Sequence, residues 1–386
     1  MNFKKLNVIT GWIIFLVATF TYLSTIEPTA SFWDCGEFIA TAFKLEVGHP
    51  PGAPLFMLLA RVAGAFVSTE HVPVAVNSLS ALASAFTILF LFWSITHMAL
   101  RMATRKGDEE LTSGKIIAVL GSGIVGALAY AWSDSFWFSA VEGEVYGMSS
   151  FFTAIVFWAI LKWESEADKP HNTRWLILIA YLMGLSIGVH LLNLLCIPAI
   201  AFVYYFKKYN VTRKGVIYTF IISAVILGAI QAVIIPGIIK LAGKFELLFV
   251  NDFGLPFNSG NFIYAAIIIG LIVWGLMWTQ RRGKALLNTV ILGVSVILLG
   301  YSTFAMIVVR SNANPPIDEN NPENVFNLVS YLNREQYGDR PLLIGQFWDS
   351  PYADEREDDR DHEGLGDLGV EPTEHCLLYT SPSPRD

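Results

Sequence analysis

The run from Val8 to Ile26, VITGWIIFLVATFTYLSTI, contains no charged side chain. A helix needs roughly 20 consecutive apolar residues to cross the hydrocarbon core of a bilayer. This run is too long for the core of a signal peptide, and no small-residue cleavage site follows it. We therefore predict that it remains in the protein as the first membrane span.

The rest of the chain repeats this character. Hydrophobic residues make up 54% of the sequence and charged residues 15%, whereas soluble domains carry about 25% charged residues. Together with the first run we predict about nine spans, which makes this an all-α polytopic membrane protein; the other eight runs are 75–100, 115–133, 146–163, 175–190, 192–206, 216–240, 261–279 and 286–309. The fifth and sixth are short, so they are either tilted spans or a re-entrant pair.

The short apolar stretch 53–67 carries Arg61 and is predicted as an interfacial helix in the first loop. Orientation follows from loop charge, because Lys and Arg collect in cytoplasmic loops. Basic residues flank every second loop, so we expect the N-terminus and those loops in the cytoplasm. The loops 27–74, 134–145 and 241–260, and the chain after 310, then face outward. No basic patch suggests binding to nucleic acid.

Two carboxylates, Asp34 and Glu37, follow the first span in the stretch SFWDCGEF, residues 31–38. Their spacing of three places both on one face of a helix. A carboxylate outside the membrane can act as general base toward a hydroxyl group within hydrogen-bond reach. The plainer interpretation is that both are solvated loop acids, but the aromatic residues around them favour a segment held against the membrane surface.

His49 lies in Gly48-His49-Pro50-Pro51-Gly52. Each proline fixes its own φ, and the residue before a proline is driven out of the helical region. The loop is therefore rigid and suits a positioned histidine, although a simple helix stop explains it too. Glu142 and Glu144, in the predicted external loop before the fourth span, either line the same cavity or form a solvated loop end.

Three further residues are candidates for binding an anion. His190 and Asn193 interrupt an apolar, glycine-containing run, and Arg310 ends the last span. Arginine recognises phosphate through two parallel hydrogen bonds. The alternatives are a satisfied buried histidine and an arginine that only anchors the helix end at the interface.

No cofactor and no metal site are predicted from the spacing of potential ligands. The cysteines Cys35, Cys196 and Cys376 form no Cys-x-x-Cys pair, so neither zinc nor a disulfide framework is expected. A divalent cation bound through the oxygens of Asp34, Glu37 and Glu142 is left open.

We divide the chain into a transmembrane domain, 1–310, and three following segments. Residues 311–350 are expected to start an external region that is truncated here, with an amphipathic helix at 322–336 and a strand at 341–345. Residues 351–375 are acidic and predicted to be disordered. Residues 376–386, CLLYTSPSPRD, match the translation of a sequencing-library adapter and are interpreted as an artefact rather than natural sequence.

The motifs FWDCGEF at 32–38, GHPPGAPLF at 48–56, Glu144-Val145-Tyr146, Gly184-Leu185-Ser186 with His190, and Asn314-Pro315-Pro316 resemble domain-of-unknown-function family 2723. That family includes the transmembrane protein 260 type of protein O-mannosyltransferase, and the bacterial branch typical of Bacteroidota is the most similar. The resemblance covers residues 1–350 and implies a GT-C glycosyltransferase in the bacterial cytoplasmic membrane.

The resemblance further implies that a sugar moves from a polyprenyl-phosphate carrier to an acceptor hydroxyl of a protein or glycan on the outer face. Asp34 matches the motif acid that serves as base, Glu37 its neighbour and His49 the motif histidine. Asp34 and Glu37 are accordingly predicted as catalytic residues. Substrate or donor binding is assigned to His49, Glu144, His190, Asn193 and Arg310, for His190 and Arg310 from their positions. A lipid or solute transporter and a non-catalytic scaffold are the rival hypotheses, although no inverted repeat of the transporter kind is evident.

Overall fold

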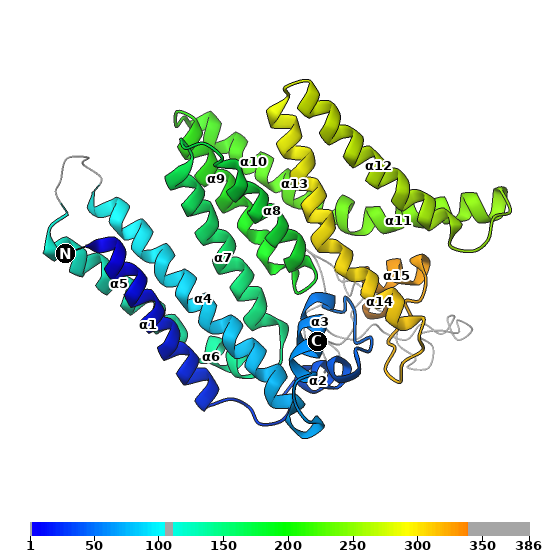
Figure 1. The fold of residues 1–386 in the computed structure, drawn as a ribbon, viewed down its shortest axis with the longest axis horizontal. Helices are drawn as coiled ribbons and strands as arrows, with labels where there is room; N and C mark the ends of the chain where they lie inside the picture. Colours follow the sequence, from blue (N-terminus) through cyan, green and yellow to red (C-terminus); the bar gives the residue numbers. More distant parts are fainter. Residues whose placement is uncertain (1, 105–110, 339–386) are drawn as a thin grey trace, which may run out of the picture. The chain divides into compact units, whose positions relative to one another are not determined.

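The computed structural model describes residues 2–104 and 111–338, and these residues are predominantly helical (Figure 1). Within the described ranges the only β-type pairing is an isolated parallel bridge between Val47 and Asp318. The predicted all-α class is therefore confirmed. The α-helices are α1 (Phe3–Ser24), α2 (Cys35–Lys44), α3 (Pro54–Gly64), α4 (Val72–Ala103), α5 (Ser113–Ala131), α6 (Asp134–Val141), α7 (Val145–Glu166), α8 (Thr173–Ile187), α9 (Ile197–Lys208), α10 (Arg213–Ala229), α11 (Ile235–Leu247), α12 (Ser259–Arg281), α13 (Ala285–Tyr301), α14 (Ala305–Ser311) and α15 (Val325–Leu332).

Short helical turns continue several of these helices. They are the 3₁₀ segments η1 (Thr69–His71), η2 (Leu191–Cys196), η5 (Ser302–Phe304) and η6 (Glu335–Tyr337), and the π-helical segments η3 (Ile230–Ile234) and η4 (Leu248–Asp252). Because η3 and η4 continue α10 and α11, the chain runs helically from Arg213 to Asp252.

Eight of the helical stretches in the described part of the chain are long and apolar enough to cross a membrane. They match eight of the nine predicted spans. The remaining one, the fifth along the chain (175–190), corresponds to α8, which has 15 residues. At 1.5 Å per residue α8 reaches about 22 Å, less than the roughly 30 Å of a hydrocarbon core. The stretch 53–67 contains the short apolar helix α3, as predicted, and the sidedness of the loops stays a prediction.

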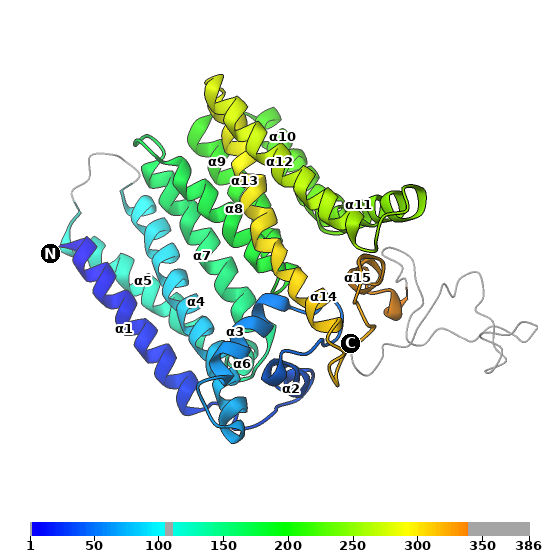
Figure 2. The same ribbon diagram turned by 45° about the vertical axis from the view of Figure 1, so that its right-hand side comes forward.

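The helices α1, α4, α5 and α7 lie side by side in both views (Figures 1 and 2). Small residues let such helices approach closely. A Cβ added to Gly123 of α5 would lie 2.7 Å from the ring of Phe92 on α4. The contact of α8 with α13 is also close, because a Cβ on Gly184 would lie 2.5 Å from the carbonyl oxygen of Ile297.

The short helices α2 and α3 pack on the N-terminal ends of α4 and α7 (Figure 2). Phe38 of α2 and Phe56 of α3 are in contact through their rings, whose centroids are 5.4 Å apart. Both belong to a buried cluster with Val76 of α4 and Met148 of α7. This apolar contact fixes the first loop on the helix bundle and so positions the acids that precede and begin α2.

Residues up to Val329 form one compact unit, and the chain from Ser330 belongs to a second. The predicted helix 322–336 is observed as α15 and η6. The predicted strand 341–345, the acidic stretch 351–375 and the adapter-like tail lie outside the described residues. The domain boundaries proposed from the sequence stay predictions.

Candidate functional site

Helix α2 presents the two carboxylates of the first loop. Trp33 has a φ of 62°, and this left-handed turn leads into Asp34, which occupies the N-cap of α2. The Asp34 side chain makes no capping hydrogen bond, and Glu37 lies in the first helical turn. Negative charge near a helix N-terminus is stabilised by the unpaired N–H groups and the helix dipole. The local fold thus holds both acids at one end of α2.

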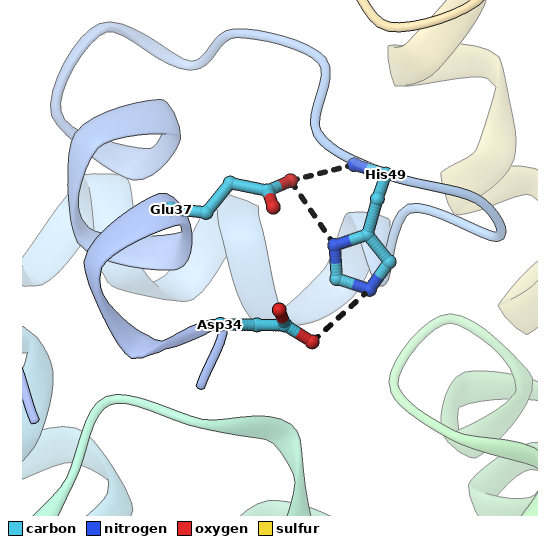
Figure 3. Close-up of side chains that lie close together, drawn as sticks. All are labelled: Asp34, Glu37 and His49. Carbon is cyan, nitrogen blue, oxygen red and sulfur yellow. Dashed lines mark hydrogen bonds and ion pairs between the residues drawn. The ribbon is translucent and has the colours of Figure 1, made fainter. Parts of the chain in front are cut away.

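His49 lies between these two acids (Figure 3). Its Nδ1 is 3.1 Å from Oε1 of Glu37, and its Nε2 is 3.8 Å from Oδ2 of Asp34. Its backbone N–H also donates to Oε1 of Glu37, at 2.6 Å. The structure therefore brings together Asp34, Glu37 and His49, three of the candidate site residues, while their catalytic and binding roles stay predictions.

The two carboxylates have different surroundings. Glu37 is committed to His49 through two hydrogen bonds, whereas no group among the described residues donates a hydrogen bond to the carboxylate of Asp34. The side chain of Asp34 is 36% exposed. The carboxylate of Asp34 is thus the more exposed of the two, and Glu37 at 26% is the less exposed.

The pKa of His49 is raised above its ordinary value. The hydrogen bond from its ring to Glu37 is the main cause; burial opposes the rise, and the charges of Glu37, Asp34 and Glu319 add to it. The protonated form of His49 is therefore favoured more than that of a free histidine, and protonation places a positive charge next to Asp34.

Glu142 and Glu144 are more buried than the sequence suggested, with 3% and 5% of their surface exposed. Ser31 donates a short hydrogen bond to Glu142, and the N–H of Val145 donates to Glu144 at 2.9 Å. Burial raises the pKa of Glu142 and brings that of Glu144 to about 7, and the charge of Asp34 contributes to the latter. Glu144 is therefore an electrostatic neighbour of the Asp34–His49 pair.

We expect Glu144→Gln to remove a pH-dependent loss of stability. A carboxyl group whose folded-state pKa rises from 4.5 to about 7 holds its proton in the folded state, so stability is lost as pH rises through that interval. Between about pH 4 and pH 8, the free energy of unfolding of wild type should fall by on the order of 3 kcal/mol relative to that of the variant. Thermal melts in detergent measure this difference, with the exposed Glu70→Gln as control. A difference that does not vary with pH would contradict the assignment.

His190 and Asn193 lie where α8 gives way to η2. The Nδ1 of His190 accepts a hydrogen bond from the N–H of Leu192 at 3.1 Å, which caps η2, and its ring lies 5.6 Å from that of Tyr146. Asn193 is fully buried and donates to Ser186 at 2.9 Å, while its Oδ1 has no partner among the described residues. This turn contacts the first loop through the N–H of Leu55, which donates to the carbonyl of Gly188 at 2.7 Å. Donor binding by His190 and Asn193 stays a prediction.

Arg310 lies at the other end of α2 from Asp34. Its Nε donates to the carbonyl of Leu45 at 2.5 Å and its Nη2 to that of Lys44 at 3.3 Å. Since α2 has 10 residues, its two ends are roughly 15 Å apart. These contacts satisfy carbonyl groups at the C-terminus of α2, and the cation next to Asp34 is His49 instead. Donor binding by Arg310 stays a prediction that these contacts do not support.

We expect Arg310→Gln to lower the stability of the protein by about 1–3 kcal/mol, the cost of losing hydrogen bonds from a charged donor. The melting temperature in detergent measures this effect, with the exposed Arg282→Gln as control. The apparent KM for a lipid-linked donor should change less than about twofold if the role is structural. A normal melting temperature with a strongly raised donor KM would instead favour the phosphate-binding role.

Three residues for which no role was predicted also shape the site. Glu319 acts on His49 because the segment after α14 pairs with Val47: the N–H of Val47 donates to the carbonyl of Ile317 at 3.0 Å, and the N–H of Glu319 donates to that of Val47 at 3.1 Å. Ser31 bonds to Glu142 across 111 positions of sequence. Gly48 leaves room for Glu37, as an added Cβ would lie 2.6 Å from Oε1.

The same cluster has the ligand atoms for a metal ion. One atom each from Asp34, Glu37 and His49 lies within 4.8 Å of the others. A mixed nitrogen and oxygen set suits a divalent transition metal better than calcium or magnesium. Glu142, suggested from the sequence as a third oxygen ligand, accepts a hydrogen bond from Ser31. The third potential ligand beside Asp34 and Glu37 is instead His49.

Part of the chain, including the loop that carries the Asp34–Glu37–His49 cluster, is similar to known proteins. Residues 34–213 match the family model described as the N-terminal domain of protein O-mannosyl-transferase TMEM260. The matched region contains every predicted site residue except Arg310.

Two curated relatives are similar to the chain. Protein O-mannosyl-transferase tmem260 of Dictyostelium discoideum is 24% identical over 202 residues, which cover 49% of this chain and 22% of the relative. Protein O-mannosyl-transferase TMEM260 of Mus musculus is 25% identical over 174 residues, covering 45% and 22%. The chain thus spans about a fifth of the length of these relatives, and no solved structure matches it. Together, the matching family model and the two relatives support a relationship of this chain to the TMEM260-like family.

Proposed function

We propose that this chain carries the catalytic site of a GT-C mannosyltransferase, which moves mannose from a polyprenyl-phosphate carrier to a Ser or Thr hydroxyl of an acceptor protein. The observation that carries the proposal is the meeting of Asp34, Glu37 and His49 at the end of an apolar helix bundle, within the region matched by the mannosyltransferase family model.

The proposed reaction uses Asp34 as general base. Its carboxylate takes the proton of the acceptor hydroxyl while the hydroxyl oxygen attacks the anomeric carbon. The bond from that carbon to the phosphate oxygen breaks, the electron pair leaves with the polyprenyl phosphate, and the anomeric configuration inverts. The imidazolium of His49 offsets negative charge next to the reacting groups, and Glu37 keeps that ring oriented and protonated.

The proposed donor depends on the predicted sidedness. Loop charge predicts that the segment bearing Asp34 faces outward. A nucleotide sugar made in the cytosol does not reach that face, whereas a lipid-linked sugar does. We therefore place the reaction on the outer face of a bacterial cytoplasmic membrane.

The proposal is tested with the purified chain in liposomes, an acceptor peptide containing Ser and Thr, and radiolabelled mannose. We expect label to enter the peptide from polyprenyl-phosphate mannose but not from a nucleotide-linked mannose. Transfer from the nucleotide donor alone, or no transfer from either, would reject the donor assignment. Movement of the lipid-linked sugar across the bilayer without transfer would favour the transporter hypothesis.

A further inference from the structure

Asn77 is a polar residue in the apolar core beneath the site. It lies in the first turns of α4, is fully buried, and follows Val76, which is fully buried as well. A buried amide costs free energy unless its hydrogen bonds are made inside the protein. The contacts of Asn77 therefore indicate which part of the structure it serves.

Both N–H groups of the Asn77 amide bind the loop that leads to Asp34. Nδ2 donates to the carbonyl of Glu27 at 2.6 Å and to that of Thr29 at 2.9 Å. Oδ1 lies 3.8 Å from the Sγ of Cys35, the first residue of α2. One side chain thus ties together both ends of the segment 27–35, and Asp34 is next to one of these ties.

Asn77 also contacts the second acid-bearing loop. A Cβ added to Gly143 would lie 2.8 Å from Oδ1 of Asn77, so the backbone between Glu142 and Glu144 packs directly on this amide. The two loops meet each other as well, since the N–H of Glu27 donates to the carbonyl of Val141 at 3.1 Å. Asn77 therefore lies at the junction of the loops that carry Asp34 and Glu144.

The chemistry of the contacts selects asparagine. Two carbonyl acceptors require two N–H donors, and the thiol of Cys35 requires an acceptor. Aspartate has nearly the same shape but offers only acceptors, so it would face two carbonyl oxygens without a proton to share. Serine is too short to reach both carbonyls and supplies a single donor.

We propose that Asn77 is a positioning residue that holds Asp34 in place relative to the Glu142–Glu144 loop. The inference rests on the proposed function for its catalytic meaning, because Asn77 touches no reacting group and acts through Asp34. A misplacement of about 1 Å can cost on the order of 10²-fold in rate. The loss of these ties should therefore lower kcat and leave the donor KM near its wild-type value.

The test combines activity with the reactivity of Cys35, whose side chain is buried. The full chain in detergent is treated with N-ethylmaleimide, and labelling of the peptides containing Cys35 and Cys196 is followed by mass spectrometry. In Asn77→Asp we expect Cys35 to label about tenfold faster or more through local opening of the loop, while Cys196 keeps its wild-type rate. The kcat for transfer should fall by about tenfold or more.

Two further variants complete the design. Thr87→Val on the same helix is the matched control, because among the described residues the buried Thr87 hydroxyl bonds only within α4, to the carbonyl of Ala83 at 3.0 Å. It should change neither readout. If Asn77→Asp unfolds the protein and both cysteines label quickly, the uncharged Asn77→Ser supplies the comparison.

Each outcome has a defined meaning. An unchanged Cys35 labelling rate in both Asn77 variants would overturn the proposal. Faster Cys35 labelling with an unchanged kcat would also overturn it, because the hydrogen bonds of Asn77 would then be structural only. A raised donor KM with an unchanged kcat would contradict it too. If wild type itself transfers no sugar, the proposed function fails, and the Cys35 labelling still decides whether Asn77 holds the loop.

Discussion

Asp34→Asn should lower the rate of sugar transfer by on the order of 10²–10⁴-fold, the usual contribution of a general base. The amide keeps the size of the side chain but takes up no proton. The carboxylate of Asp34 accepts no hydrogen bond from the described residues, and the variant weakens only its ion pair with His49 at 3.8 Å, so the fold should tolerate the change. The measurement is kcat with polyprenyl-phosphate mannose, together with a melting temperature that shows the variant is folded.

Asp134→Asn is a matched control for this experiment. Asp134 is exposed and begins a short helix, α6, in another loop predicted to face outward. Its replacement should leave the rate of transfer within about twofold of wild type, because substitution of an exposed charge that lies outside the candidate site usually has a small effect. A folded Asp34→Asn protein that transfers sugar at the wild-type rate would reject Asp34 as the base.

Gly48→Ala should have the second largest effect. The added Cβ would lie 2.6 Å from Oε1 of Glu37, closer than two such atoms can approach, so the carboxylate must move. The hydrogen bonds that the Glu37 carboxylate accepts from the ring and from the backbone N–H of His49 are then lost or lengthened. We expect transfer to fall by about tenfold or more, because a small displacement of positioned groups is costly.

The pH dependence of Gly48→Ala gives a second readout. Glu37 is the main cause of the raised pKa of His49, so the variant should bring that pKa down and lose the imidazolium at lower pH. The alkaline limb of the pH–rate profile should therefore move to lower pH. Gly114→Ala, where an added Cβ meets nothing within 4 Å, is the control and should behave as wild type. Wild-type activity and profile in Gly48→Ala would show that the Glu37–His49 contact is dispensable.

The fold was largely predictable because membrane spans are local features. Runs such as 8–26 and 261–279 are recognisable by length and composition, and both are helices in the structure. The exception, α8, ends at Ile187 because the chain turns at Gly188, whose backbone binds the first loop. That contact joins segments more than 130 residues apart in sequence, and an apolar count does not detect it.

The site was predictable only where its residues are neighbours in sequence. Asp34, Glu37 and His49 fall within one short segment, so spacing and a rigid loop brought them together. Asn77 and Glu319 reach the site through packing and pairing with distant segments, and their local sequence carries no such signal. Arg310 was recognised as a cation, but its partners are backbone carbonyls of α2, which are the same for every sequence.

The pairing of Val47 with Ile317 and Glu319 has a mechanical consequence. The segment after α14 does not leave the first loop at once. Its backbone is hydrogen-bonded to that loop at Val47, two residues before His49. Tension applied to the chain after Glu319 is therefore delivered to the His49 loop before it reaches α14. The backbone at Glu319 is thereby coupled directly to the loop that carries His49.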